Sequence, residues 1–158
     1  MLLAMPDVER RAVRTQIVFD CAEPHRLAAF WAVALHYRHE EIDGFVGGLL
    51  DAGHVPAEVT TRVDGVLRWK DLASLRHPDD GVDERGAGTG RRLLFQAVPE
   101  PKSAKNRMHL DLIVGPGNVD AEVERLVGLG ATVLDVHEEP QGRWVLMADP
   151  EGNEFDVT

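Results

Sequence analysis

The spacing of apolar residues changes from that of a strand to that of a helix early in the chain. Residues 13–20 lack glycine and proline and carry Val13, Ile17, Val18 and Phe19, which is typical of a strand buried on at least one face. Gln16 and Val18 share one face of this strand. Pro24 then suits the first turn of a helix, and helical spacing continues through Leu27, Phe30, Trp31, Ala34 and Leu35. The pattern predicts a strand followed by an amphipathic helix that faces the core.

The same order of elements returns in the second half. Residues 107–114 have the composition of a strand, and the turn residues Gly115, Pro116 and Gly117 follow it. Asn118 can cap a helix with an apolar stripe, and Gly130 lies where that helix would end. Three strand-like runs separated by turn residues come next, at residues 131–136, 143–148 and 154–158. The second half is therefore predicted to be β-α-β-β-β.

The later strands of the first half are less clear, because residues 40–80 give mixed signals. They contain candidates for one helix and two strands, at residues 44–52, 58–63 and 69–75. Residues 91–98 have the clear pattern of a strand. Residues 80–90 are rich in glycine and charge, so we expect an exposed and mobile loop there.

These elements predict one α+β domain over residues 1–158. It consists of two modules, at about 12–99 and 106–158, joined by a linker. Two β-α-β-β-β units of this size cannot each bury a large core alone, so we expect them to pair and pool their strands into a curved mixed sheet with helices outside. The concave face between the modules is the predicted pocket for a small molecule.

Charge and cysteine content narrow the classes of function. The chain has 17 basic and 27 acidic residues, a formal net charge of −10, which disfavours binding to nucleic acid or to anionic membrane surfaces. The single cysteine, Cys21, allows no internal disulfide and matches no zinc motif, so we expect a small buried side chain. Residues 1–11 lack the continuous apolar region of a signal peptide, and no apolar run is long enough to span a bilayer, which predicts a cytoplasmic location.

Four segments of the sequence carry a family likeness. They are Phe30-Trp31 and residues 105–111, 128–131 and 144–155. The last is the most specific, because Asp149-Pro150-Glu151-Gly152-Asn153 resembles the turn of a family's closing hairpin, whose next strand is expected to bring a carboxylate back toward the pocket. From about Thr15 to the C-terminus the chain resembles the vicinal-oxygen-chelate superfamily, and within it the glyoxalase-like and bleomycin-resistance-like proteins. The resemblance implies their fold of paired βαβββ modules, with residues 40–80 as an elaboration specific to a subgroup.

The resemblance also implies a metal site. In metal-dependent members each module supplies ligands from its first and last strands, which here correspond to Gln16, Gln96, His109 and Asp156. The metal would be a divalent ion such as Zn, Ni, Mn or Fe. Two of the four ligands would be neutral amides, which bind such metals weakly. The alternative is therefore that His109 and its neighbours form a polar pocket that binds no metal.

Candidate catalytic and substrate-binding residues follow from the same likeness. Glu154 or Asp111 would move a proton next to an activated carbonyl. The candidate substrate-binding residues are Trp31, Trp69, Arg107 and Trp144. Trp69 opens a segment that is either a lid over the ligand or a surface helix ended by Pro78. Arg107 belongs to a basic cluster that either attracts an anionic substrate or forms a solvated linker.

Two functions remain open at this point. The first is a metal-dependent lyase or isomerase that acts on neighbouring oxygens of a small organic molecule. The second is a non-catalytic protein that binds or sequesters such a molecule, as resistance proteins of this superfamily do. Related proteins build the pocket from paired modules of one chain or of two chains. The resemblance therefore also allows a homodimer, and the sequence does not decide between the two arrangements.

Overall fold

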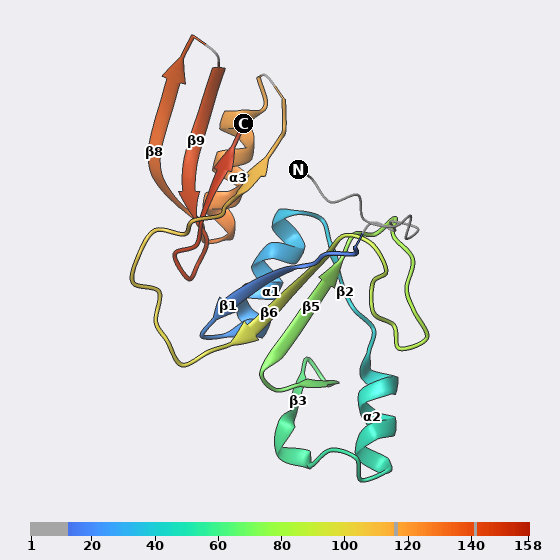
Figure 1. Ribbon diagram of the computed structural model, residues 1–158. Helices are drawn as coiled ribbons and strands as arrows, with labels where there is room; N and C mark the ends of the chain where they lie inside the picture. Colours follow the sequence, from blue (N-terminus) through green and yellow to red (C-terminus); the bar gives the residue numbers. More distant parts are fainter. Residues whose placement is uncertain (1–12, 116, 141) are drawn as a thin grey trace, which may run out of the picture.

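The computed structural model describes residues 13–115, 117–140 and 142–158, and it contains two four-stranded mixed sheets with helices (Figure 1). Residues 1–12, within which the sequence predicts no signal peptide, lie outside the described part of the chain. None of the described helices has the length and apolarity needed to cross a membrane.

The N-terminal sheet has the strand order β1-β6-β5-β2. Strand β1 runs parallel to β6, and the other neighbours are antiparallel. The strands are β1 (Ile17–Cys21), β2 (Arg38–His39), β5 (Leu72–Arg76) and β6 (Arg92–Ala97). Helix α1 (Pro24–Ala34) contacts β5 and β6 with its apolar face. The first predicted strand and helix are thus confirmed, although β1 begins at Ile17 rather than at residue 13.

The C-terminal sheet has the order β7-β10-β9-β8, again with one parallel pair, β7 and β10. The strands are β7 (Leu110–Leu112), β8 (Thr132–Glu139), β9 (Gly142–Ala148) and β10 (Glu154–Val157). Helix α3 (Val119–Leu129) ends at Gly130, whose φ of +110° confirms the predicted helix end. Asn118 occupies the N-cap position, but its side chain donates to the Val114 carbonyl instead of capping the helix.

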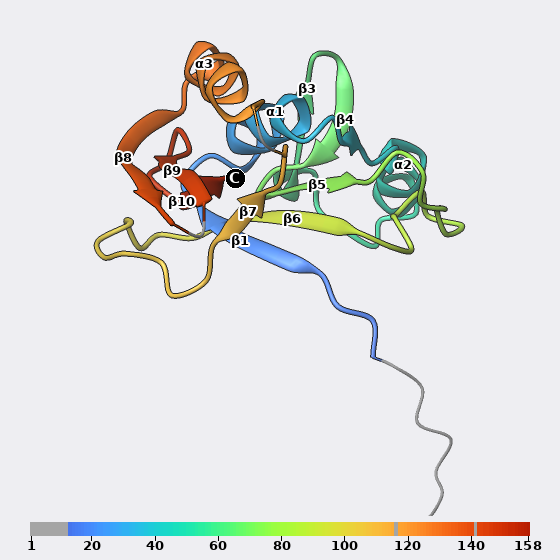
Figure 2. The ribbon, with the colours of Figure 1, turned by 90° about the horizontal axis from the view of Figure 1, so that it is seen from above.

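One hydrophobic core joins the two sheets. Helices α1 and α3 contact each other on one side of the sheets (Figure 2), and the rings of Trp31 and Phe155 meet at 5.2 Å between centroids. Strands β1 and β7 lie at the edges of their sheets, so the modules pair through side chains and not through one continuous ladder. The predicted α+β fold of two paired modules is confirmed, with two open sheets in place of a single one.

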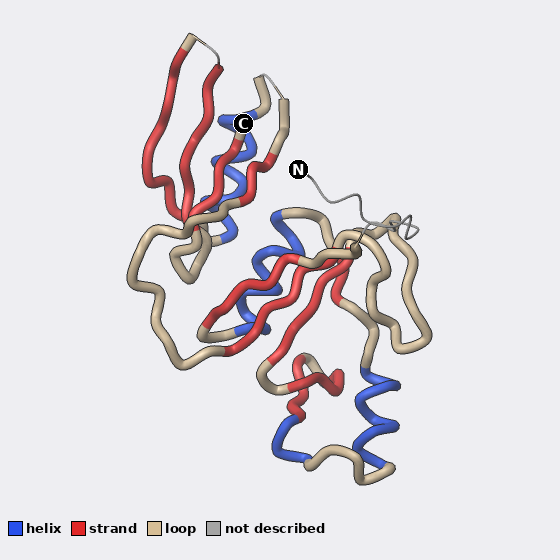
Figure 3. Tube along the Cα trace, in the orientation of Figure 1, coloured by secondary structure: helices blue, strands red, loops and turns tan. Residues whose placement is uncertain are grey.

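Residues 40–70 form an additional unit beside the N-terminal sheet (Figure 3). It comprises α2 (Asp43–Asp51), the 3₁₀ turn η1 (Ala57–Val59), and the hairpin β3 (Thr60–Val63) and β4 (Val66–Trp69). The helix predicted at 44–52 is confirmed. The surface helix considered for 69–80 is wrong: Trp69 ends β4, and β5 pairs with β6, which buries three consecutive residues of β5.

A turn from the second module holds the first helix of the first module. In the Asp149–Asn153 turn, Asp149 Oδ2 accepts a hydrogen bond of 3.0 Å from Trp31 Nε1. The Glu151 carboxylate accepts hydrogen bonds from the backbone N–H groups of Ala22 and Glu23, at 2.7 and 2.8 Å, just before α1 begins. We call Trp31, Asp149 and Glu151 the inter-module clasp. A carboxylate is favourable there because the N-terminus of a helix carries unpaired N–H groups and a positive dipole end.

The glycine-rich loop is docked on the N-terminal sheet. The N–H of Gly88 donates to Glu40 Oε1 at 2.7 Å, and Asp83 accepts hydrogen bonds from the N–H groups of Arg85 and Ala87. Gly86 has a φ of +84°, and a Cβ at this position would lie 2.1 Å from the Glu41 carbonyl oxygen. Most loop residues are nevertheless exposed, so the mobility expected for residues 80–90 stays a prediction.

Replacing Gly86 with alanine should undock this loop, because the new Cβ meets backbone and the left-handed φ is strained. We expect the free energy of unfolding to fall by about 1–3 kcal/mol. Amide hydrogen exchange should quicken at residues 86–88. Gly44→Ala is the control, since a Cβ there meets nothing within 4 Å. Equal exchange rates in the two variants would show that the loop is mobile already in the wild-type protein.

Candidate functional site

Three titratable side chains gather on the open face of the C-terminal sheet. Strand alternation buries Phe155 and Val157 of β10 in the core and turns Asp156 to the opposite face. Asp156 pairs in register with Asp111 of β7, and His109 precedes Asp111 by two residues, so all three share this face.

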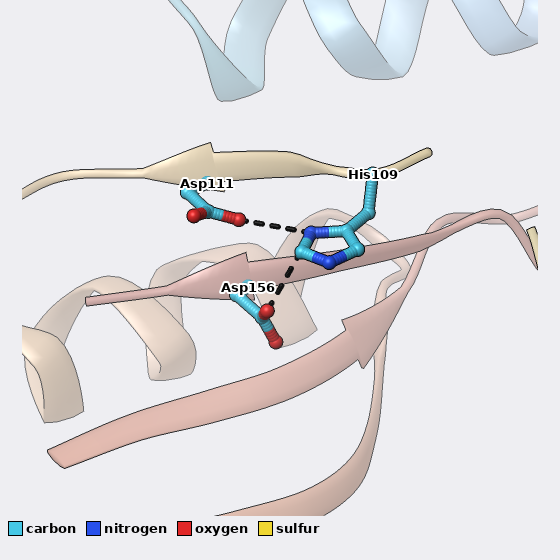
Figure 4. A group of neighbouring side chains, drawn as sticks. All are labelled: His109, Asp111 and Asp156. Atoms are coloured by element: carbon cyan, nitrogen blue, oxygen red, sulfur yellow. Dashed lines mark hydrogen bonds and ion pairs between the residues drawn. The ribbon is translucent and has the colours of Figure 1, made fainter. Parts of the chain in front are cut away.

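The three side chains are close enough to act together (Figure 4). His109 Nδ1 lies 2.9 Å from Asp111 Oδ1 and 3.6 Å from Asp156 Oδ2, and one ligand atom of each residue lies within 4.8 Å of the others. Asp156 Oδ1 is buried and has no hydrogen-bond partner among the described residues. Burial raises the pKa of Asp156, although His109 and Lys105 oppose this shift. Asp156 is therefore a partly desolvated carboxylate with one oxygen near His109 and the other without a hydrogen-bond partner in the described part of the chain.

These donors fit a divalent metal. Ligand atoms that share an ion at about 2.1 Å stand about 3.0–3.4 Å apart, and the two distances from His109 Nδ1 bracket this spacing. Imidazole and carboxylate are donors that Zn, Mn and Fe accept. The unpartnered oxygen of Asp156 is the observation that tests the fit, because a buried polar atom without a partner is costly and a cation would satisfy it.

A cavity of about 1140 Å³ lies beside this group, between the edge strands of the two sheets. It is lined by β1, by parts of the linker after β6 and by the residues that lead into β7, with His109 among them. Asp111 and Asp156 do not line the cavity, so His109 is the member of the group that faces it. A ligand in the cavity could thus reach a metal held at His109.

Glu154, a predicted catalytic residue, forms hydrogen bonds with two residues of the linker. Its carboxylate accepts hydrogen bonds from the Asn106 N–H at 3.0 Å and from Lys102 Nζ at 3.2 Å. Burial alone would raise the pKa of Glu154, but these hydrogen bonds outweigh it and lower the pKa. Glu154 ties the linker to the start of β10, and its proton affinity is that of an ion-paired carboxylate.

The two amides predicted as metal ligands lie on the N-terminal sheet. Gln16 lines the cavity just before β1, and its Oε1 accepts a hydrogen bond from Arg92 Nη1. Gln96 is exposed on β6, opposite Asp20 of β1, and is absent from the cavity lining.

The predicted substrate-binding residues fall in different places. Trp31 is 1% exposed and forms part of the cavity wall. Arg107 lines the cavity and is exposed. Trp69 ends β4 outside the cavity lining, and its carbonyl is 2.9 Å from His25 Nε2. Trp144 lies on the same sheet face as Asp156, stacked on His137 at 4.9 Å between ring centroids, also outside the lining.

Two further residues near the cavity were not found from the sequence. Glu40 is fully buried and binds Arg92, which in turn holds Gln16; Glu151 caps α1. Glu151 belongs to the Asp149–Asn153 segment of the family likeness, but no local pattern reveals the distant partner of either residue. Cys21, by contrast, is buried as expected, and its pKa is raised to about 12 by burial and by the charges of Glu151 and other acids, so its thiol is no nucleophile.

The chain was compared with protein-family models, with curated proteins and with solved structures. A family model described as "Glyoxalase-like domain" matches residues 16–158. No curated protein matches the sequence. Three similar solved structures span nearly the whole chain, and all share less than 20% of its residues.

The first is a glyoxalase/bleomycin resistance protein/dioxygenase family enzyme from Burkholderia phytofirmans, with a TM-score of 0.58 and 15% identity, covering 90% of this chain and 94% of that one. The second is a mutant of the fosfomycin resistance protein FosX from Listeria monocytogenes, complexed with Mn(II) and 1S,2S-dihydroxypropylphosphonic acid (0.57; 11%; 94% and 90%). The third is a bleomycin-binding protein from Streptomyces verticillus, complexed with copper(II)-bleomycin (0.51; 17%; 94% and 97%). At these identities the likeness shows the fold alone.

Proposed function

Because the chain belongs to the glyoxalase-like domain family, we propose that it binds a small organic molecule in the cavity beside a divalent metal held by His109 and Asp156. The observation that carries this proposal is the buried, unpartnered Oδ1 of Asp156 next to an imidazole that faces the cavity. The FosX structure with Mn(II) and a phosphonate, and the bleomycin-binding protein with a copper complex, support the pairing of a metal with an organic ligand on this fold.

The first candidate activity is that of a lyase or isomerase. A bound metal would supply positive charge that polarises two neighbouring oxygens of the ligand. The chain's own residues would then bind and orient the ligand: Arg107 has no ion-pair partner among the described residues and can bind an anionic group at the cavity. The two sheets enclose the ligand and reduce its contact with water.

The second candidate is a binding or sequestering protein without catalysis. It is favoured by the contacts of Glu154, which lines the cavity: hydrogen bonds from Lys102 and Asn106 lower the pKa of its carboxyl and make it a weak base. A homodimer suits either candidate, because the edges of β1 and β7 beside the cavity have no strand partner within the described chain.

The metal test comes first. Protein purified without a histidine tag and dialysed against a chelator should bind one Mn, Zn, Ni or Fe(II) per chain in calorimetric titration. His109→Ala should lower the affinity at least about 10-fold, because it removes a direct ligand. The absence of binding and of any metal-dependent thermal shift in the wild-type protein would contradict the proposal.

The choice between the two activities needs a ligand. Metal-loaded protein can be incubated with small dicarbonyls, vicinal diols and phosphonates and followed by NMR of the small molecule. A new product that needs both the metal and the cavity indicates a lyase or isomerase. Line broadening without any product indicates a binding protein.

A further inference from the structure

The metal site proposed above has a third ligand that the family likeness did not assign to it. We propose that Asp111 completes the site, and that the metal is therefore held by one module, through His109, Asp111 and Asp156. This inference rests on the proposed metal site. In it the amides Gln16 and Gln96 of the other module are not ligands.

The first support is the position of Asp111. Its Oδ1 is 2.9 Å from His109 Nδ1, and its register partner across the parallel pair is Asp156. No hydrogen bond or ion pair other than that with His109 is formed by its side chain within the described chain. Asp111 is also 53% exposed, so it can rotate toward an ion without losing packing.

The second support is that the side chain of Gln16 is already bound to Arg92. The amide oxygen is the only atom of a glutamine side chain suited to a metal, and in Gln16 it accepts a hydrogen bond from Arg92. Arg92 is fixed in turn by Glu40, with Nε to Oε1 at 2.6 Å and Nη2 to Oε2 at 2.8 Å. Turning Gln16 toward a metal would break this bond and bring a dication close to a guanidinium.

The third support comes from charge. Two carboxylates and a neutral imidazole balance the charge of a divalent ion, whereas one carboxylate, one imidazole and two amides leave one positive charge uncompensated. Carboxylate oxygens also bind such ions more strongly than amide oxygens. The charge of the ligand set therefore favours Asp111 over Gln16 and Gln96.

The consequence concerns the ligand. Three protein donors on one face of an ion leave coordination positions open, which is the arrangement of metal sites that bind substrate oxygens directly. Because the donors come from the C-terminal sheet, Gln16, which lines the cavity from the N-terminal module, is left to bind the ligand's other end. Its amide N–H groups can donate hydrogen bonds to the ligand while its oxygen stays bound to Arg92.

The experiment is a calorimetric titration of Mn²⁺ into full-length wild-type protein and five variants. Asp111→Asn should weaken binding at least about 10- to 100-fold, because it removes a charged ligand. Gln16→Ala and Gln96→Ala should change the affinity less than 3-fold. Asp135→Asn is the matched control, since it removes one exposed charge from the same sheet face without touching His109. The electron paramagnetic resonance spectrum of bound Mn²⁺ should change with Asp111→Asn alone.

The outcomes separate the two proposals. If Gln16→Ala or Gln96→Ala weakens binding as much as Asp111→Asn does, the site spans both modules and the inference is overturned while the metal site stands. If the wild-type protein binds no Mn²⁺, Zn²⁺ or Ni²⁺, the proposed function itself fails. Asp111→Glu guards against a folding defect: it keeps the carboxylate, so it should bind more tightly than Asp111→Asn, and equal weakening would count against ligation.

Discussion

Replacement of Arg92 by leucine should lower the free energy of unfolding by about 3–5 kcal/mol, because it leaves a charge buried without its partner. Glu40 has a fully buried side chain, and both of its carboxylate oxygens accept hydrogen bonds from Arg92. Ser74 and Gly88 also donate to Glu40, but neither is charged. Urea denaturation of the two proteins measures the difference.

The control is Arg85→Leu, which breaks an ion pair with Asp83 in which the arginine is 51% exposed. Exposed pairs contribute about 0–1 kcal/mol. A second comparison adds Glu40→Gln to Arg92→Leu, which removes the unpaired charge and should recover part of the loss. If Arg92→Leu costs no more than Arg85→Leu, the buried pair does not stabilise the fold.

The destabilisation caused by Arg92→Leu should change with pH in a definite direction. Burial by itself raises the pKa of Glu40, but hydrogen bonds from Arg92, Ser74 and Gly88 outweigh burial and lower it. A carboxyl whose pKa is lower in the folded state stabilises the protein above its unfolded pKa, and this stabilisation is lost as the pH falls through the folded value. In Arg92→Leu the burial effect dominates, so the destabilisation relative to wild type should shrink on acidification.

The local elements could be predicted because their signals are local. Pro24 and the apolar stripe that follows it define α1, and Gly130 ends α3, without any knowledge of the partners of these helices. Part of the candidate metal group was also named from the sequence: the family likeness implies His109 and Asp156 as ligands, but it gives Asp111 only a catalytic role. Alternation along a strand places His109 and Asp111 on one face, and the family likeness brings Asp156 to the neighbouring strand.

The failures concern contacts between distant residues. Arg92 and Glu40 are 52 positions apart in the sequence. They meet because β6, which contains Arg92, and β2, which directly precedes Glu40, lie on either side of β5 in the sheet. No local sequence pattern predicts that pair. The hydrogen bond from Arg92 to Gln16 therefore could not be predicted from the sequence. The error at residues 69–80 has another cause: a short apolar run fits helical and strand spacing equally well, and only the pairing of β5 with β6 decides between them.

The second large effect should come from the inter-module clasp. Asp149 is 3% exposed, and it accepts hydrogen bonds from Trp31 Nε1 and from the backbone N–H groups of Glu151 and Asn153. Alanine at this position leaves these donors without an acceptor, and each buried unsatisfied group costs about 1–3 kcal/mol. We expect Asp149→Ala to lower the free energy of unfolding by about 3–5 kcal/mol.

A double-mutant cycle separates the contact between the modules from the contacts within the turn. Trp31→Phe keeps an aromatic ring in the core but removes the N–H and part of the ring volume. The packing cost of the smaller ring occurs with and without Asp149, so the coupling with Asp149→Ala reports the bond that joins α1 to the turn. We expect a coupling of about 1–2 kcal/mol, measured by urea denaturation. Asp120→Ala is the control for loss of an exposed carboxylate, since this side chain is 82% exposed and forms only a surface ion pair with Arg143. A coupling near zero would mean that the turn is stabilised by its own hydrogen bonds, and that the shared hydrophobic core and the hydrogen bonds to Glu151 keep the two sheets in place without the Trp31–Asp149 bond.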